Sequence, residues 1–97
     1  MLEQIAAEEF DALVGQAIAI TSAEATVHWE LAGVRRLNAP SPRPQPPFVL
    51  TLRDNGAARS WPQGIYRLAH PQRGELDLFV VPVGPDGRGM CYEVTFN

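Results

Sequence analysis

Gly74-Glu-Leu-Asp-Leu-Phe-Val-Val-Pro-Val83 and Met90-Cys-Tyr-Glu-Val-Thr-Phe96 are the two stretches that decide the fold, and Gly84-Pro-Asp-Gly-Arg-Gly89 lies between them. Apolar residues occupy every second position of both stretches: Leu76, Leu78 and Val80, then Met90, Tyr92, Val94 and Phe96. Because successive side chains of a strand point to opposite faces, this period of two indicates half-buried strands. Pro85 favours a turn, and Asp86-Gly87 tolerates left-handed geometry. The two stretches are therefore predicted to form a β-hairpin.

The same alternation recurs in four earlier segments, at about 16–21, 27–34, 48–53 and 65–69. In the second of these segments the apolar phase changes parity at Gly33, which predicts a β-bulge that bends a long strand. One helix and about six strands at this spacing predict a mainly β (α+β) fold. We expect an antiparallel, six-stranded bent sheet or small barrel, and the alternation alone does not choose between the closed and the open form.

Residues 2–14 are predicted to form the one helix. An apolar stripe with helical spacing runs along it, formed by Leu2, Ile5, Ala6, Phe10, Leu13 and Val14. Gly15 is placed to end the helix in left-handed geometry. A helix this short is marginal alone, so we expect it to pack across one face or one open end of the sheet. The β region then runs over about 16–97, and residues 1–97 make a single domain.

The connection over 39–47 holds five prolines: Pro40, Pro42, Pro44, Pro46 and Pro47. Proline cannot donate to a strand ladder, so we predict a stiff connection of the polyproline-II type. Within it, Arg43-Pro-Gln-Pro-Pro47 faintly resembles a ligand of SH3 domains, but direct entry into a strand favours a rigid connector.

The core is predicted from the inward phase of the strands and of the helix. It consists of Phe10, Leu13, Ile18, Ile20, Trp29, Leu31, Phe48, Leu50, Leu52, Ile65, Leu76, Leu78, Val80, Tyr92, Val94 and Phe96.

Composition limits the classes of function. The chain has 97 residues, 45% of them hydrophobic, and a net charge of −3. Nucleic-acid binding is disfavoured, because it needs a concentrated basic face. The apolar runs are too short to span a membrane, and the acidic N-terminal stretch is unlike a signal peptide. With a single cysteine, Cys91, a cytoplasmic location is the expectation.

The residues able to carry chemistry show no catalytic pattern. His28, His70 and Cys91 have no zinc-site spacing, and we expect a surface imidazole at the first and a turn cap at the second. Glu75 and Asp77 lie two apart on one strand face, which is more typical of a solvated face than of an acid–base pair. We therefore predict no enzyme activity, no metal and no cofactor.

One strand has apolar residues on both faces. Phe79 and Val81 fall on the phase opposite to the core residues of their strand, so either the helix or a partner is expected to cover them. Together with Trp61 and His70 they form the candidate interaction surface.

Several motifs resemble a small bacterial domain family of unknown function. They are Glu9-Phe10, Val14-Gly15, Trp29-Glu-Leu31, Pro47-Phe-Val-Leu50, Gln63-Gly-Ile-Tyr-Arg-Leu-Ala-His-Pro71 and Phe79-Val-Val-Pro-Val-Gly84. The most specific part is Pro82-Val-Gly-x-Asp86 followed by Tyr92-Glu-x-x-Phe-Asn97. Members of the family are often encoded near phage-tail-collar-like proteins, and the resemblance therefore implies an accessory or assembly role. It implies no catalytic residue.

The predicted function is a non-enzymatic protein-interaction or assembly module, with a protein partner or self-association and a phage-tail-like accessory role among its forms. The alternative is a β-barrel that binds a small apolar ligand, with Trp29, Trp61, Tyr66 and Tyr92 lining its interior. The partner, the ligand, the oligomeric state and the biological process are not specified by the sequence.

Overall fold

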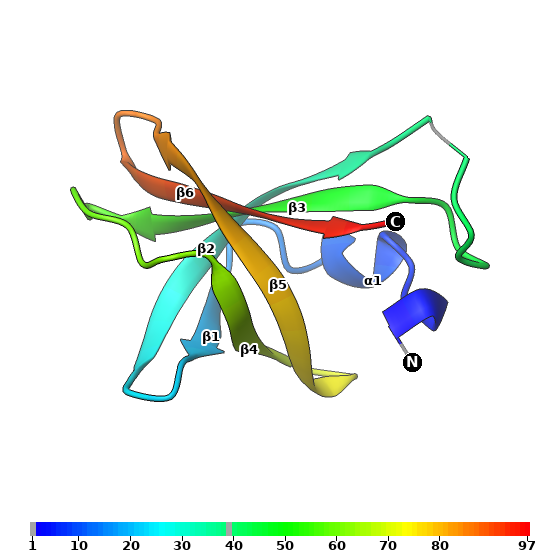
Figure 1. Cartoon of the computed structure of the whole chain (residues 1–97), viewed down its shortest axis with the longest axis horizontal. Helices are drawn as coiled ribbons and strands as arrows, with labels where there is room; N and C mark the ends of the chain where they lie inside the picture. The colour runs from blue at the N-terminus through cyan, green and yellow to red at the C-terminus, as the bar shows by residue number, and fades with distance from the viewer. Residues whose placement is uncertain (1, 39) are drawn as a thin grey trace.

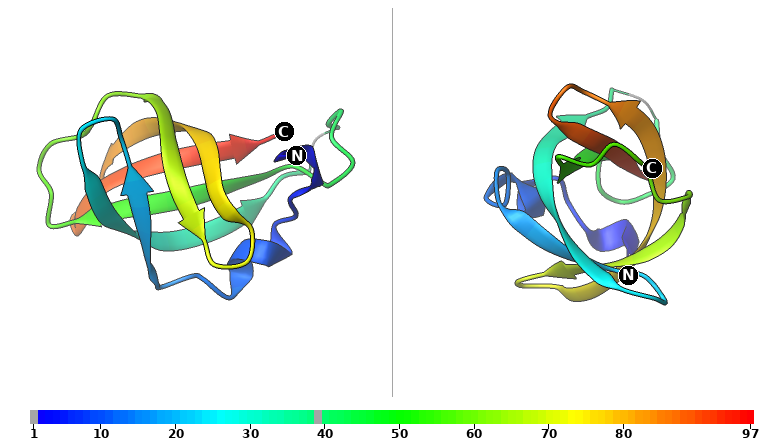
Figure 2. Two further views of the ribbon diagram at one scale, coloured as in Figure 1. Left: turned by 90° about the horizontal axis from the view of Figure 1, so that it is seen from below. Right: turned by 90° about the vertical axis from the view of Figure 1, so that its left-hand side faces the viewer.

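The computed structural model describes residues 2–38 and 40–97, and strands dominate this part of the chain (Figure 1). Six antiparallel strands close into a barrel in the order β1-β2-β3-β6-β5-β4 (Figure 2). The strands are β1 (Ala17–Thr21), β2 (Thr26–Arg36), β3 (Phe48–Asn55), β4 (Gly64–His70), β5 (Gly74–Pro85) and β6 (Gly89–Phe96). The predicted mainly β fold is confirmed, and the closed barrel is the form it takes.

The predicted terminal hairpin is formed by β5 and β6, which pair from Val81↔Glu93 to Pro85↔Met90. At its tip the Asp86 carboxylate accepts hydrogen bonds from the backbone N–H groups of Arg88 and Gly89, at 3.0 and 3.1 Å. Gly87, between Asp86 and Arg88, has φ 89°, the left-handed geometry that glycine adopts without strain.

The predicted bulge in β2 is also present. The register of β2 against β3 shifts between Leu31 and Gly33. Residues 26–30 of β2 pair with β1, and residues 30–36 of β2 pair with β3. The bend at the bulge therefore lets one long strand follow the curvature of the barrel and pair with a different neighbour along each half.

The prediction of one helix over 2–14 is wrong. The structure contains a 3-10 turn, η1 (Leu2–Gln4), and a single helical turn, α1 (Glu8–Asp11). Tertiary contacts take the groups that a continuous helix would use: the Arg43 guanidinium binds the carbonyl oxygens of Leu2 and Ile5. The Glu9 carboxylate accepts the backbone N–H of Ala6 at 2.9 Å.

The burial pattern of this N-terminal segment changes accordingly. Ile5, Ala7, Phe10 and Leu13 are buried, whereas Leu2 and Val14 from the predicted stripe are exposed. The Phe10 ring contacts Phe48 at the start of β3, Phe96 at the end of β6 and His70 on β4, with ring centroids 5.0 to 6.0 Å apart. The segment therefore fills one end of the barrel, as Figure 1 shows for α1.

The proline-rich connector bends on its way to β3. Its first residue, Ala39, lies outside the described residues, and the backbone bends at 42–45. Arg43 stabilises the bend, because its guanidinium donates to the carbonyl oxygens of Gln45 and Pro46 at 3.1 and 2.9 Å. The same guanidinium lies 5.4 Å from the ring centroid of Phe48, so it also covers that end of the core.

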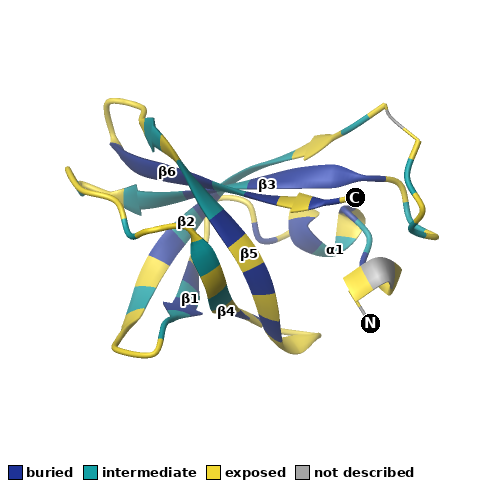
Figure 3. Ribbon diagram, viewed as in Figure 1, coloured by how far each residue is buried: buried dark blue, intermediate teal, exposed yellow. Residues whose placement is uncertain are grey.

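The predicted core is correct except at one position. Figure 3 shows the alternation of buried and exposed residues along β5 that such a prediction relies on. Ile65 is 62% exposed, because the inward residues of β4 are Tyr66, Leu68 and His70. Arg67 shares the parity of Ile65 and faces solvent, and this polar neighbour is the signal that could have placed Ile65 outside.

Candidate functional site

An apolar side-chain pair stands on the outer face of the barrel. Ile65 of β4 and Phe79 of β5 are directly opposite each other in the antiparallel ladder. Phe79 faces outward because its neighbours Leu78 and Val80 alternate with it, and Leu78 and Val80 are buried. Ile65 is 62% exposed and Phe79 is 51% exposed. This Ile65–Phe79 pair therefore consists of large apolar side chains, of the kind usually found in a core, that face solvent.

A groove of about 550 Å³ lies on one side of this pair. We call it the β5–β6 groove; it is lined by Leu2, Pro42, Arg43, Ile65, Asp77, Leu78, Phe79, Val94, Thr95, Phe96 and Asn97. The groove forms where β5 and β6 separate, because their ladder stops at Val81↔Glu93. Figure 1 shows the two strands diverging beyond that point.

A second hollow, of about 520 Å³, adjoins Ile65 but not Phe79. This aromatic hollow is lined by the turn Ser22–Ala25 and by Trp61, Pro62, Ile65 and Tyr66. Ile65 therefore belongs to both hollows. The backbone N–H of Trp61 donates to the Tyr92 hydroxyl at 2.8 Å, and the Tyr66 hydroxyl donates to the Pro62 carbonyl oxygen, which fixes the wall of the hollow to the core.

The structure separates the four residues of the predicted interaction surface. Phe79 is exposed, whereas Val81 and Trp61 are half-buried. Neither η1 nor α1 covers Phe79. Trp61 packs edge-on against the buried Trp29, with ring centroids 5.4 Å apart, so it contributes one side to the aromatic hollow while the other belongs to the core.

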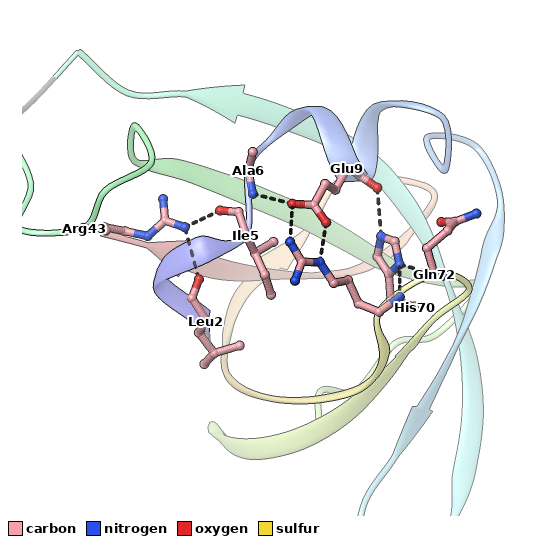
Figure 4. A network of polar contacts seen from close by, with 8 residues as sticks. Leu2, Ile5, Ala6, Glu9, Arg43, His70 and Gln72 are labelled. Atoms are coloured by element: carbon pink, nitrogen blue, oxygen red, sulfur yellow. Dashed lines mark hydrogen bonds and ion pairs between the residues drawn. The ribbon is translucent and has the colours of Figure 1, made fainter.

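His70 does not belong to this surface, because only 3% of it is exposed. Its Nδ1 accepts the backbone N–H groups of Gln72 and Arg73, both at 3.1 Å, which is the turn cap that the sequence predicted. With Nδ1 accepting, Nε2 carries the hydrogen and donates it to the Glu9 carbonyl oxygen at 2.8 Å (Figure 4). His70 thus anchors α1 to the barrel.

The two carboxylates considered as an acid–base pair both contact the same arginine. Arg67 contacts Asp77 at 2.9 Å and Glu75 at 3.5 Å on the outer face. The hydrogen bond from Arg67 holds the pKa of Asp77 below its ordinary value, whereas a general acid needs a raised pKa. The pair behaves as the solvated, charged margin of the outer face.

The remaining candidate ligands are dispersed over the barrel. His28 is exposed on β2 and Cys91 is buried on β6, where burial raises the pKa of its thiol. Within residues 2–38 and 40–97, no three His, Cys, Asp or Glu side chains gather as a metal site would require. Over the same residues, no helix has the length and apolar character needed to traverse a bilayer.

A protein-family model described as "Domain of unknown function (DUF6916)" matches residues 5–96. The chain belongs to this family. The resemblance to a domain family of unknown function is thereby confirmed. No curated protein and no solved structure matches the chain. The DUF6916 match runs from Ile5 to the last residue of β6 and includes every residue that lines the two hollows except Leu2 and Asn97.

Proposed function

We propose that this DUF6916 domain is a non-enzymatic docking module that binds another protein through the Ile65–Phe79 pair and the two hollows beside it, on the outer side of β4 and β5. The observation that carries the proposal is the exposed Ile65–Phe79 pair, which lines two neighbouring hollows that share Ile65. Large apolar side chains gathered in one exposed patch usually mark a contact surface.

The surroundings of the pair resemble the arrangement of a protein–protein interface. Such interfaces have an apolar, aromatic centre and a polar rim. Here Phe79 and Ile65 form the centre, and Trp61 lines the same hollow as Ile65. Arg67 and Asp77, paired with each other at 2.9 Å, form part of the rim. A salt bridge that stays in contact with water at the rim of an interface contributes little to stability or binding, so this pair is compatible with a rim position.

The apolar-ligand alternative is not favoured by the interior of the barrel. The four aromatic residues that would line a cavity instead pack on one another: Trp29 stacks on Tyr92 with ring centroids 4.0 Å apart. Trp61 and Tyr66 complete this cluster, with their ring centroids 5.3 Å apart. The hollows described above lie outside this packed interior, and they suit a protein surface better than an enclosed lipid-like molecule.

A matched pair of variants tests the proposal. Phe79→Asp places a charge at the centre of the patch, whereas Val83→Asp places one on another exposed position of β5, outside both hollows. The wild-type protein and both variants are immobilised and exposed to a lysate of the source organism, and sedimentation velocity measures their self-association.

Central apolar anchors of interfaces contribute at least about 2 kcal/mol, or about thirtyfold in affinity. We therefore expect Phe79→Asp to lose the partner or the self-association, and Val83→Asp to keep it. Equal retention of every bound protein by the two variants would contradict the proposal. A wild-type protein that is monomeric and retains no partner would contradict it as well.

A further inference from the structure

We propose that the β5–β6 groove binds an extended segment of a partner polypeptide, whose backbone hydrogen-bonds to the free strand edges beyond Val81↔Glu93. This inference rests on the proposed docking function and specifies the form of the partner.

The first argument is the pairing of the two strands. Beyond the end of their common ladder, β5 still pairs with β4, from Gly64↔Val80 to His70↔Gly74. Likewise, β6 still pairs with β3 as far as Phe48↔Phe96. Each strand therefore has one occupied edge and one edge that faces the groove. A free strand edge is a template for another strand, because its backbone N–H and C=O groups are already aligned.

The second argument is which residues line the groove. A surface on one face of a strand is lined by every second residue. The β5–β6 groove is instead lined by consecutive residues: Asp77, Leu78 and Phe79 from β5, and Val94, Thr95 and Phe96 from β6, followed by Asn97. This pattern indicates a groove that runs along strand edges. Three to four residues of strand correspond to about 10–13 Å of an extended segment.

The third argument is the chemistry of the walls. Leu78, Val94 and Phe96 are buried core residues whose atoms reach the groove, and Leu2 and Phe79 are exposed at its margin. An extended segment with apolar side chains at alternate positions can place them on these walls.

The charged side chains that line the groove, Arg43 and Asp77, already have partners within the domain, so they do not favour a charged ligand. Arg43 is engaged by backbone carbonyl oxygens, including those of Leu2 and Pro46. Asp77 is paired with Arg67, with Arg67 Nε 2.9 Å from Asp77 Oδ1. The compensated charges and the apolar walls together fit a neutral, apolar strand. The volume of about 550 Å³ lies within the range of ~300–1,000 Å³ typical of ligand sites.

The test uses a phage-displayed library of random peptides about nine residues long, selected on the immobilised full chain. Selected peptides are synthesised and titrated against the wild-type protein, Phe79→Asp and the control Val83→Asp. Two further measurements report on the backbone: amide hydrogen exchange of residues 77–80 and 94–96, and a scan in which single peptide amides are N-methylated.

We expect peptides that bind the wild type and Val83→Asp alike but bind Phe79→Asp at least about tenfold more weakly. Binding should slow amide exchange at 77–80 or 94–96. N-methylation should weaken binding about tenfold at every second peptide position and little between, because only alternate amides of a strand point to one neighbour.

Three results would overturn the inference. One is a library that yields no peptide sensitive to Phe79→Asp. Another is a Phe79-dependent peptide that leaves the amides of both strands unprotected and tolerates N-methylation; this would leave the docking face intact but exclude strand addition. The third is a wild-type dimer in which these amides are protected without peptide, since a second copy would then be the occupant.

Discussion

His70 holds Glu9 from a position 61 residues further along the chain, with its Nε2–H donating to the Glu9 carbonyl oxygen at 2.8 Å. Arg73, in the same β4–β5 turn, donates to both carboxylate oxygens of Glu9, at 2.5 and 3.0 Å. One residue of α1 is thus fixed at its backbone and at its side chain (Figure 4). Because a single helical turn has no stability of its own, these contacts keep α1 at the barrel end together with the buried Phe10 ring and the Asp11–Arg36 ion pair.

Replacing His70 should therefore loosen the N-terminal segment. His70→Phe keeps the ring but leaves the N–H groups of Gln72 and Arg73 and the carbonyl oxygen of Glu9 without their partner. Each such buried polar group costs about 1–3 kcal/mol, and partial access of water reduces the sum, so we expect a loss of about 2–3 kcal/mol. Urea denaturation measures it, and amide exchange should accelerate first at α1.

His28→Phe is the control, because His28 is an exposed imidazole on β2. It should change the free energy of unfolding by less than about 0.5 kcal/mol. Equal losses in the two variants would show that His70 does not anchor α1.

Because of the contact between Glu9 and Arg73, we expect the free energy of unfolding to decrease at acidic pH. The Arg73 hydrogen bond, with the backbone N–H of Ala6, lowers the pKa of Glu9 from 4.5 to about 2. A carboxylate whose pKa is lower in the folded than in the unfolded state stabilises the fold above the unfolded pKa. This contribution is complete above pH 4.5 and declines as the pH falls towards 2.

Glu9→Gln removes this pH dependence, so it should be less stable than the wild type at pH 7 and approach it at pH 2.5. Denaturant titrations at the two pH values give the comparison. The exposed Glu24, in the turn after β1, provides the control Glu24→Gln, for which we expect a small difference at both pH values. A Glu9→Gln difference that stays constant from pH 7 to 2.5 would refute the assignment.

The parts of the fold that the sequence predicted correctly depend on local pattern. The two-residue period from Leu76 to Phe96 specifies the hairpin, and the parity change at Gly33 specifies the bulge. The prediction of a helix over 2–14 is wrong because a residue far away in the sequence, Arg43, binds the carbonyl oxygens of Leu2 and Ile5. No local propensity contains that contact.

The candidate site was predicted only in part, for a similar reason. The parity of β5 identified Phe79, but Ile65 was assigned to the core although Arg67 shares its face. The β5–β6 groove depends on where the ladder ends, at Val81↔Glu93. That end is set by how two long strands coil around the barrel, which the hydrophobic pattern does not encode.

Gly89 should be intolerant of any side chain. A Cβ at this position would lie 2.2 Å from the Asp54 carbonyl oxygen and 2.8 Å from Asn55 Cα. Both are backbone atoms of β3, so β3 and β6 would have to move apart. We expect Gly89→Ala to cost about 3 kcal/mol or more, at the upper end for an overpacked position, measured by thermal or urea denaturation.

Gly33→Ala is the matched control, because a Cβ there meets nothing within 4 Å and the position is also in a strand. We expect it to change stability by less than about 1 kcal/mol. If Gly89→Ala were as stable as Gly33→Ala, the close approach of β6 to β3 would be wrong.

Because of the buried Tyr92 hydroxyl, we expect the free energy of unfolding to decrease at alkaline pH. Its ring is buried against Trp29, and burial raises the pKa of its hydroxyl above 10.0. The unfolded chain then releases this proton at a lower pH than the folded chain, so the contribution of Tyr92 is complete below pH 10 and declines above it. Tyr92→Phe should lose less stability between pH 8 and 11 than the wild type does, in denaturant titrations at both pH values.

At neutral pH the same variant should be less stable than the wild type, because the Trp61 N–H loses its hydrogen-bond acceptor, at a cost of about 1 kcal/mol. Tyr66→Phe serves as the control. It removes a hydroxyl that donates to the Pro62 carbonyl oxygen, in a bond exposed enough for water to replace the hydroxyl. Tyr66→Phe should therefore lose less stability than Tyr92→Phe at pH 8, and its stability should still decrease between pH 8 and 11. If Tyr66→Phe abolished this decrease and Tyr92→Phe kept it, the burial of the Tyr92 hydroxyl would be contradicted.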